Sequence, residues 1–286
     1  MLQSVSDIRQ IAVCGAGTMG AGIAQVSAAA GFPTLLFDVK PEAVSAGMDM
    51  IRKNLGKAVE KGKLKPEDSD ATLQRLTPCH HIADCRADLI IEAIVEKVPV
   101  KVSLFRELAQ HNPATTIFAS NTSSLSVSAI AAEIPHPERV AGMHFFNPAH
   151  LMALVEIVSA TQTVPAIAQL LYQLVQHMGK TPVHVKDAPG FIVNRVARHY
   201  YLEAMEIAQS GAADLQTIDR LLEAAGFRMG PFALMDLIGN DVNFAVTKSL
   251  YEAFHEAPRF KPGALQAALV EKGELGRKTG QGFYKY

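Results

Sequence analysis

A glycine-rich turn near the N-terminus constrains the fold of this chain more than any other feature of its sequence. The hexapeptide GAGTMG at positions 15–20 follows a short apolar run at 8–14 and precedes an alanine-rich stretch closed by Gly31. A G-x-G-x-x-G pattern between a strand and a helix lets the backbone approach a pyrophosphate, which the N-terminus of the helix faces. The expected dinucleotide-binding residues of this turn are Gly15, Gly17, Thr18, Met19 and Gly20.

An acidic residue at the end of the next predicted strand supports this interpretation, for which the hexapeptide alone would be a weak signal. Residues 34–37 are apolar and lead into Asp38, 18 positions after Gly20. A carboxylate at about this spacing binds the ribose hydroxyls of the adenosine half of the cofactor. Asp38 would repel the 2′-phosphate of NADP, so the sequence predicts NAD as the cofactor. Lys40 is the one nearby feature that argues for NADP.

Apolar runs and helical stretches alternate from the glycine turn to residue 186. This alternation predicts an α/β fold, a Rossmann-type doubly wound sheet with helices on both faces. A helix is expected at 41–63 and a loop at 66–70, followed by a short helix and a turn that contains Cys79. Further strands are expected from 89 and at 116–119, 139–143, 154–158 and 181–185. The run at 154–158 should be antiparallel to its predecessor, because no crossover helix separates the two.

The character of the chain changes after residue 186. From Phe191 onward the apolar residues recur with helical spacing, and no convincing strand follows. A chain of 286 residues is also long for one compact domain. We therefore expect a Rossmann-type NAD-binding domain at 1–186, followed by an all-helical C-terminal domain at 187–286.

One histidine and one carboxylate lie inside the two apolar runs between residues 139 and 158. His144 ends the first run, Asn147 and Pro148 make a turn, and Glu156 stands in the middle of the second run. A buried carboxylate is costly unless it is paired, so we expect Glu156 to pair with His144 across two adjacent strands. A histidine held in this way is a general base with a fixed tautomer. Taken alone, a satisfied core histidine beside an edge-strand glutamate is the simpler interpretation.

Composition argues against several classes of function. The net charge is −1 at pH 7, so neither a nucleic acid nor an anionic membrane is expected as a partner. No apolar run is long enough to cross a bilayer, and we expect no secretory signal peptide before residue 11. Three cysteines are an odd and sparse set, which favours a reducing, cytoplasmic setting. The run of Cys79, His80 and His81 with Cys85 fits no common zinc spacing, so no metal site is expected.

Three polar features allow both a structural and a functional interpretation. Lys53, Lys57 and Lys61 share one face of the predicted helix, where lysines usually form a solvated surface. Like charges at this spacing repel each other, however, and an anionic ligand would relieve them. The hydroxyl-rich run at 120–124 would ordinarily be a turn or a helix cap, but the ligand crevice of such a sheet also lies at the strand ends. Asn194 is either an ordinary surface group or a residue that points back at this crevice.

The motifs along the whole chain resemble those of one enzyme family. They are GAGTMG, EAIVEK, SNTSSLS, HFFNP, LVEIV, PGFIVNR, GPFALMDLIGND and GRKTGQGFYKY, and in this order they resemble the L-3-hydroxyacyl-CoA dehydrogenase family. The chain is most similar to the short bacterial members, the 3-hydroxybutyryl-CoA dehydrogenases. This resemblance implies reversible, NAD-dependent oxidation of a short-chain (S)-3-hydroxyacyl-CoA to the 3-oxoacyl-CoA. It also implies a homodimer formed through the helical domain, with acyl-CoA as the bound partner; acyl chain length and pathway stay open.

The same resemblance implies roles for individual residues, transferred by motif position. His144 and Glu156 match the catalytic pair of the family. Ser123 and Asn194 match positions that contact the reacting oxygen or orient the site. Glu96 and Lys101 match positions around the nicotinamide, and Asn147 matches a structural asparagine of the HFFNP turn. The full set is His144 and Glu156; Ser123 and Asn194; Asp38, Glu96, Lys101 and Asn147 on the cofactor side; and Lys57 and Lys61 for the CoA phosphates.

Three other functions compete with this interpretation. A hydroxyacid dehydrogenase with a lysine base would need a lysine on the long helix, which offers Asn194, Arg195 and Arg198 instead. A dehydrogenase of the same fold could act on a hydroxy acid or sugar acid that carries no CoA. A dinucleotide sensor without catalysis would have no need to keep His144 and Glu156 together.

Overall fold

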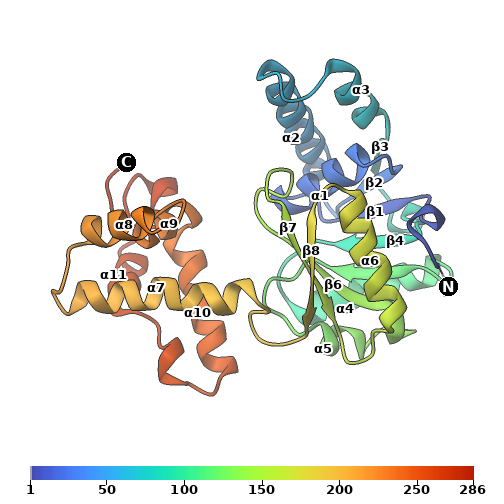
Figure 1. Cartoon of the computed structure of the whole chain (residues 1–286). Helices are drawn as coiled ribbons and strands as arrows, with labels where there is room; N and C mark the ends of the chain where they lie inside the picture. Colours follow the sequence, from blue (N-terminus) through green and yellow to red (C-terminus); the bar gives the residue numbers. More distant parts are fainter. Residues whose placement is uncertain (1) are drawn as a thin grey trace. The chain divides into compact units, whose positions relative to one another are not determined.

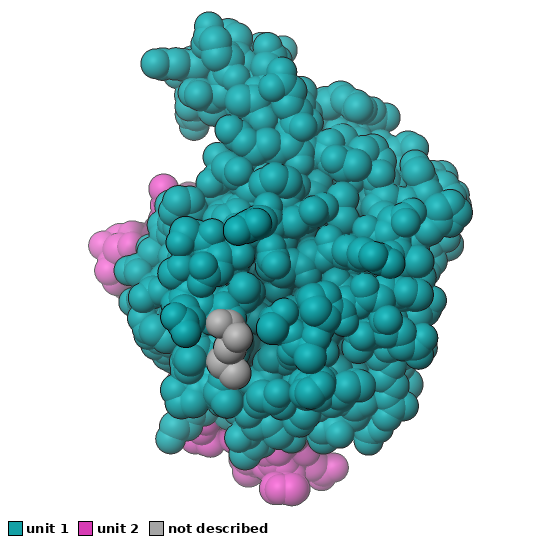
Figure 2. Space-filling view, turned by 90° about the vertical axis from the view of Figure 1, so that its right-hand side faces the viewer, with its two compact units in different colours: residues 1–188 teal, residues 189–286 magenta. Residues whose placement is uncertain are grey.

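The computed structural model describes residues 2–286, which divide into two compact units (Figures 1 and 2). Unit 1 extends to Ala188, and unit 2 runs from Pro189 to Tyr286. Unit 1 contains a single sheet flanked by helices, whereas the regular secondary structure of unit 2 is helical. The predicted fold class is therefore confirmed.

The sheet of unit 1 has eight strands in the order β3-β2-β1-β4-β5-β6-β7-β8. Strands β1 to β6 are parallel, and their order is that of a doubly wound dinucleotide-binding sheet. Strand β7 is antiparallel to β6, as predicted, and β8 is parallel to β7. The strands are β1 (Ile11–Cys14), β2 (Thr34–Phe37), β3 (Leu76–Cys79), β4 (Leu89–Glu92), β5 (Ile117–Ser120), β6 (Val140–Phe145), β7 (Leu154–Ser159) and β8 (Thr181–Lys186).

Helices cover both faces of this sheet. On one face, α1, α2 and α6 pack against alternate strand residues such as Val13, Ile91 and Ala119 in the main hydrophobic core. On the other face, the ring of Phe105 on α4 lies 5.1 Å from that of Phe118 on β5. The helices of unit 1 are α1 (Thr18–Ala29), α2 (Pro41–Glu60), α3 (Pro66–Gln74), α4 (Val98–His111), α5 (Val127–Ala131) and α6 (Pro165–His177).

The segment between 66 and 80 differs from the prediction. Residues 66–70, expected to be a loop, begin α3, because Pro66 occupies the first helical position and Glu67 and Asp68 follow in the first turn. Strand β3, which was not predicted, ends at Cys79, and the expected turn follows it at His80 and His81. Pro78 of this strand has no N–H group to donate, which an edge strand tolerates, and β3 lies at the edge of the sheet.

Unit 2 is built from five α-helices within the described residues, followed by a short tail that contains a 3-10 helix at Arg277–Thr279. The long first helix begins at Val193 rather than Phe191, because Gly190 and Phe191 have positive φ angles of 73° and 50°, which are not helical. The helices are α7 (Val193–Gln209), α8 (Leu215–Ala224), α9 (Pro231–Ile238), α10 (Asn240–Ala253) and α11 (Ala264–Glu271).

Two buried aspartates hold the tail of unit 2 to its helices. Asp236 accepts hydrogen bonds from the backbone amides of Phe283 and Tyr284, each at 2.9 Å. Asp219 accepts from the amide of Phe232 in the first turn of α9 and from the hydroxyl of Tyr284. Both aspartates are buried, so each compensates the cost of its burial with backbone and hydroxyl donors.

Candidate active site

The glycine turn lies at the carboxyl edge of the sheet, the edge where the parallel strands β1 to β6 end. Gly15 follows β1 with a φ of +105°, and a Cβ there would lie 2.5 Å from the carbonyl oxygen of Ala93 beyond β4. A Cβ on Gly20 would lie 1.6 Å from the carbonyl oxygen of Gly15. Both positions therefore require glycine, because the turn and the start of α1 are packed against each other and against the end of β4.

The start of α1 fits a pyrophosphate. A Cβ on Gly17, the N-cap residue, would meet no atom within 4 Å, so this position opens onto space that a ligand can enter. No side chain caps α1, and Thr18 in its first turn is exposed. The first backbone amides of the helix therefore face this space without a side-chain acceptor, which is the arrangement that binds a phosphate anion.

Asp38 follows β2 and is held by two backbone amides. Its Oδ2 accepts a hydrogen bond from Ala16 at 2.9 Å, and its Oδ1 accepts one from Lys40 at 3.0 Å. These contacts fix the carboxylate beside the glycine turn at the end of the second strand. Its position and chemistry fit the ribose of an adenosine group.

His144 and Glu156 face each other across β6 and β7. They are directly opposed in the antiparallel register, and His144 Nδ1 lies 2.7 Å from Glu156 Oε2. The His144 side chain is 7% exposed and that of Glu156 is 0% exposed, so this contact is shielded from water. A neutral His144 that donates its Nδ1 hydrogen to the carboxylate has Nε2 as its proton acceptor.

The loop that carries Ser123 is ordered by Glu96. Glu96 Oε1 accepts hydrogen bonds from the Thr122 hydroxyl at 2.6 Å, from the Ser123 amide at 2.9 Å and from the Ser123 hydroxyl at 3.3 Å. Burial opposes ionisation of Glu96, but Lys101 and these hydrogen bonds outweigh it and lower the pKa of Glu96. Lys101 Nζ lies 3.1 Å from Glu96 Oε2.

Glu92, the last residue of β4, also contacts Lys101, although its sequence position did not single it out as a site residue. It is fully buried, and its Oε1 lies 2.6 Å from Lys101 Nζ. Asn121 is a second such residue, since its Oδ1 accepts a hydrogen bond from the amide of Phe145 at the end of β6. A glutamate inside an apolar strand and polar residues at strand ends are the sequence signals for both residues.

The other predicted residues lie on three further segments of the chain. Asn147 is exposed in the turn after β6. Asn194 lies in the first turn of α7 in unit 2, where its carbonyl accepts a hydrogen bond from Arg198 Nε at 3.2 Å. Helix α2 ends at Glu60, so Lys57 is in its last turn and Lys61 is its C-cap residue, beyond the helix.

Lys57 and Lys61 stand at the far end of an arm formed by α2 and α3, which extends away from the sheet (Figure 1). A helix of this length spans about 30 Å, so this end is remote from Asp38. Both lysines are exposed, and neither forms an ion pair with any residue from 2 to 286. Their positive charge is therefore open to an anion in solution.

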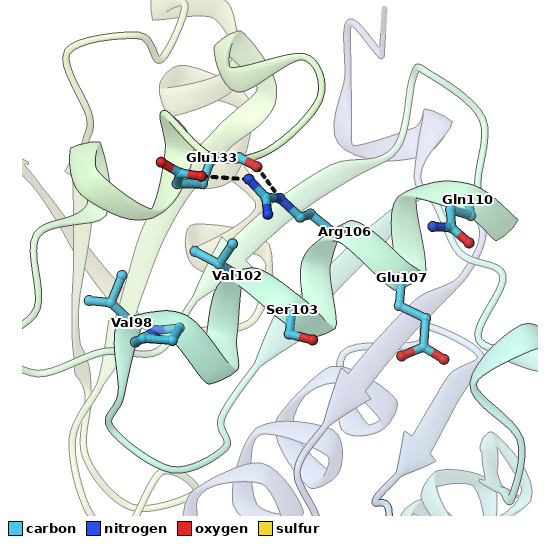
Figure 3. Close-up of a pocket in the computed structure, with 8 residues that line it drawn as sticks. Val98, Val102, Ser103, Arg106, Glu107, Gln110 and Glu133 are labelled. Atoms are coloured by element: carbon cyan, nitrogen blue, oxygen red, sulfur yellow. Dashed lines mark hydrogen bonds and ion pairs between the residues drawn. The ribbon is translucent and has the colours of Figure 1, made fainter.

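A hollow of about 680 Å³ lies on the surface of α4, away from these groups (Figure 3). Val98, Val102 and Arg106 line it, and Arg106 pairs with Glu133 across it. None of the residues predicted to form the site lines this hollow. The size of this hollow therefore does not identify it as the active site.

The described residues form neither a metal site nor a membrane span, and their cysteines are free thiols. Among residues 2–286, no group of three or more His, Cys, Asp or Glu side chains is placed to hold a metal ion. Cys79 and Cys85 are free thiols with their sulfur atoms 3.4 Å apart, and burial raises the pKa of Cys79 to about 12. Within the same residues, no helix is both long enough and apolar enough to cross a membrane.

A doubly wound sheet with this glycine turn and this acid after β2 defines a dinucleotide-dependent dehydrogenase. Residues 10–188 match the family model described as 3-hydroxyacyl-CoA dehydrogenase, NAD binding domain, and residues 190–286 match 3-hydroxyacyl-CoA dehydrogenase, C-terminal domain. The chain belongs to the 3-hydroxyacyl-CoA dehydrogenase family, and it is an NAD-dependent oxidoreductase. The predicted family, cofactor and enzyme class are confirmed.

Three relatives illustrate the similarity. The chain is 49% identical over 282 residues to the 3-hydroxyadipyl-CoA dehydrogenase of Escherichia coli strain K12, an alignment that covers 98% of this chain and 59% of that protein. It is 39% identical to a Bacillus subtilis strain 168 protein named "Probable 3-hydroxybutyryl-CoA dehydrogenase", with 98% of each chain covered. The crystal structure of (S)-3-hydroxybutyryl-CoA dehydrogenase from Ralstonia eutropha is 37% identical with a TM-score of 0.93, covering 98% of this chain and 99% of that chain. The chain thus spans only part of the E. coli relative but nearly all of the other two.

Proposed function

We propose that this chain oxidises the 3-hydroxyl group of a short-chain (S)-3-hydroxyacyl-CoA, with 3-hydroxybutyryl-CoA as the expected substrate, and that the reaction is reversible. The observation that carries this proposal is the buried contact of 2.7 Å between His144 Nδ1 and Glu156 Oε2. The names of the B. subtilis and R. eutropha relatives support the choice of substrate. The product is the corresponding 3-oxoacyl-CoA.

The His144 and Glu156 pair acts as the general base. Nε2 of neutral His144 takes the proton of the hydroxyl group, and the charge of Glu156 stabilises the imidazolium that forms. NAD, when bound, supplies the acceptor for the hydride that leaves C3. The protein contributes the base, its orientation and the surrounding charge.

The other predicted residues bind and orient the two ligands. Ser123 and Asn194 contact the reacting oxygen of the substrate or orient it. Glu96 supports the role of Ser123, because its Oε1 accepts five hydrogen bonds from residues 122–124. Glu96 and Lys101 lie around the nicotinamide, and Asn147 shapes the turn after β6. The glycine turn and Asp38 bind the adenosine diphosphate half, while Lys57 and Lys61 attract the CoA phosphates.

The active protein is a homodimer formed through unit 2. Large apolar side chains on the surface of unit 2 support this assembly, because a second copy would remove them from water; they include Leu221, which is 69% exposed, and Phe227, Leu237 and Val242. The three free thiols are consistent with a reducing, cytoplasmic setting.

A substrate with a terminal carboxylate is the second candidate. It is favoured by one observation, the 49% identity to the E. coli protein named for 3-hydroxyadipyl-CoA. The two candidates share the thioester and the 3-hydroxyl group and differ only at the far end of the acyl chain. A hydroxy acid or sugar acid without CoA is the third possibility.

Formation of NADH, measured by its absorbance, tests these candidates. The purified protein is given NAD with (S)-3-hydroxybutyryl-CoA, with 3-hydroxyadipyl-CoA, or with free 3-hydroxybutyrate. The proposal expects the highest kcat/KM with the hydroxybutyryl thioester and negligible turnover of the free acid. A higher kcat/KM for the adipyl thioester would establish the second candidate, and turnover of the free acid alone would overturn the CoA assignment.

A further inference from the structure

The proposed mechanism leaves one fully buried carboxylate without a function, that of Glu92. Its Oε1 accepts hydrogen bonds from Lys101 Nζ at 2.6 Å and from the amide of Ile94 at 2.7 Å. Its Oε2 accepts one from the hydroxyl of Ser120 at 2.7 Å. These donors come from α4, from the loop after β4 and from the end of β5, so Glu92 connects three segments beneath the carboxyl edge of the sheet.

The contacts of Glu92 identify its charge state. An ammonium and a backbone amide can only donate, so Oε1 is an acceptor in both bonds. The Ser120 hydroxyl accepts from the amide of Thr122 at 3.3 Å and gives its own hydrogen to Oε2. Burial raises the pKa of Glu92, while Lys101, Ser120 and Ile94 oppose that rise. With donors on both oxygens, Glu92 is a carboxylate near neutral pH.

The cluster of Glu92, Glu96 and Lys101, of which Glu92 and Lys101 are buried, therefore carries one net negative charge. Lys101 Nζ lies between the two carboxylates, 2.6 Å from Glu92 and 3.1 Å from Glu96. The Lys101 side chain is 1% exposed, and that of Glu96 is 37% exposed. One ammonium cannot neutralise two carboxylates, and the shielded position of this cluster limits screening by water and salt.

The position of this cluster relates it to one half of the cofactor. Glu92 ends β4 and is paired in register with Cys14 on β1 and with Ser120 on β5. A dinucleotide crosses such a sheet at the point where the strand order reverses, which here lies between β1 and β4. Asp38 marks the adenosine half at β2, so the nicotinamide half falls over β4 to β6. The nicotinamide ring is a cation in NAD⁺ and neutral in NADH.

We propose that Glu92 is a specificity-determining residue for the oxidation state of the cofactor: together with Glu96 and Lys101 it places one negative charge at the nicotinamide end and strengthens the binding of NAD⁺ relative to NADH. This inference rests on the proposed position of the nicotinamide in the dehydrogenase site. A purely structural Glu92, which only joins α4 to the sheet, would affect the two forms of the cofactor equally. The ratio of the two dissociation constants therefore separates the two roles.

Equilibrium titration without substrate measures this ratio. Calorimetry gives the Kd of NAD⁺, and the fluorescence of NADH gives the Kd of NADH. Glu92→Gln keeps the shape of the side chain and removes the charge, so Kd(NADH)/Kd(NAD⁺) should fall about fivefold, the effect of one charge roughly 10 Å away in a partly shielded site. A Glu92→Gln protein in which both constants change by the same factor would overturn the proposal.

A second variant separates charge from packing. Glu92→Gln/Lys101→Met removes one carboxylate and the ammonium, which returns the net charge of the cluster to −1. The ratio of its two Kd values should come back to within about twofold of the wild-type ratio, even if both Kd values change because the ion pair between Glu92 and Lys101 is lost. A ratio that stays at the Glu92→Gln value would show that geometry and not charge is responsible. Replacing both members of a buried ion pair is also better tolerated than replacing one.

Two further variants complete the test. Glu107→Gln makes the same substitution at an exposed position of α4 and should leave the ratio unchanged (Figure 3). If Glu92→Gln does not fold, Glu96→Gln removes the same unit of charge from a more exposed position and should also lower the ratio; an unchanged ratio there would overturn the proposal. Failure of the wild type to bind either form would instead refute the proposed function.

Discussion

Both units bury charged side chains, but they surround them with different partners. In unit 1, Glu92 contacts Lys101 and Glu156 contacts His144, so each of these buried carboxylates faces a basic side chain. In unit 2, Asp236 accepts hydrogen bonds from backbone amides, a tyrosine hydroxyl and an asparagine amide. A carboxylate among such donors fixes the chain, whereas one beside a basic side chain can stabilise a changing positive charge. The kind of partner, and not burial alone, distinguishes a reactive site.

The largest effect predicted from this comparison is on turnover, at His144. His144→Gln retains a side chain that can donate a hydrogen bond to Glu156 but removes the base, so kcat should fall by about 10²–10⁴. The midpoint of urea unfolding and the Kd of NAD should stay near the wild-type values, because the core and the glycine turn are untouched. Steady-state kinetics and a urea titration check both expectations. If His144→Gln lowered the free energy of unfolding as much as Asp236→Asn is expected to, the two units would not differ in the way described.

Asp236 in unit 2 should show the opposite pattern. Each carboxylate oxygen of Asp236 accepts one of the two tail amides, so Asp236→Asn replaces one of these acceptors with an amino group that cannot accept and leaves its buried donors unpaired. The free energy of unfolding should fall by about 3 kcal/mol, while the Kd of NAD, which binds unit 1, stays unchanged. Urea unfolding and NAD titration of the same sample measure the two quantities. Weaker NAD binding without loss of stability would contradict a structural role.

The lysines on the arm of unit 1 should act only through the charge of the substrate. Lys57→Glu/Lys61→Glu should raise KM for the CoA thioester about fivefold at low ionic strength, with kcat little changed. Salt should reduce the difference, and a pantetheine thioester without the nucleotide should show almost none. Lys272→Glu is the matched control, because Lys272 is the exposed C-cap residue of α11 in unit 2. An equal rise in KM for the CoA thioester and the pantetheine thioester would show that these lysines only form an ordinary solvated surface.

The smallest predicted effect is on the pH dependence of stability. The pKa of Glu96 is lower in the folded chain than its ordinary value of 4.5. Such a carboxylate adds stability above its unfolded pKa and loses it as the pH falls towards the folded pKa. Glu96→Gln should therefore flatten the fall in unfolding free energy between about pH 5 and pH 3. Urea titrations across this range test it, with exposed Glu107→Gln as the control; equal slopes for all three proteins would contradict the expectation.

The parts of the site that the sequence predicted are those set by short spacings along the chain. Asp38 lies one strand after the glycine turn, and His144 and Glu156 lie on strands joined by one turn, so their spacing determined their positions. A short helix was predicted after residue 70, but the first turn of the helix at 66–74 was predicted as a loop, because proline is common in loops as well as at the first helical position. Strand β3 was missed because it contains a proline, which only an edge strand tolerates.

The parts that the sequence did not predict depend on contacts between distant segments. Glu92 lies in an apolar strand, and its partners Lys101 and Ser120 follow 9 and 28 residues later on other elements. Asp236 similarly bonds to Phe283, 47 residues away. Local periodicity shows that a carboxylate is buried, but it does not show which donors compensate it.

A double-mutant cycle on His144 and Glu156 tests most directly the claim that the two residues act as one catalytic unit. The values of kcat/KM for (S)-3-hydroxybutyryl-CoA are measured for the wild type, His144→Gln, Glu156→Gln and the double variant. If Glu156 acts only through His144, the double variant should be no slower than His144→Gln, within about twofold. If the two losses multiply instead, Glu156 acts independently of His144, and the paired-base account of this site is wrong.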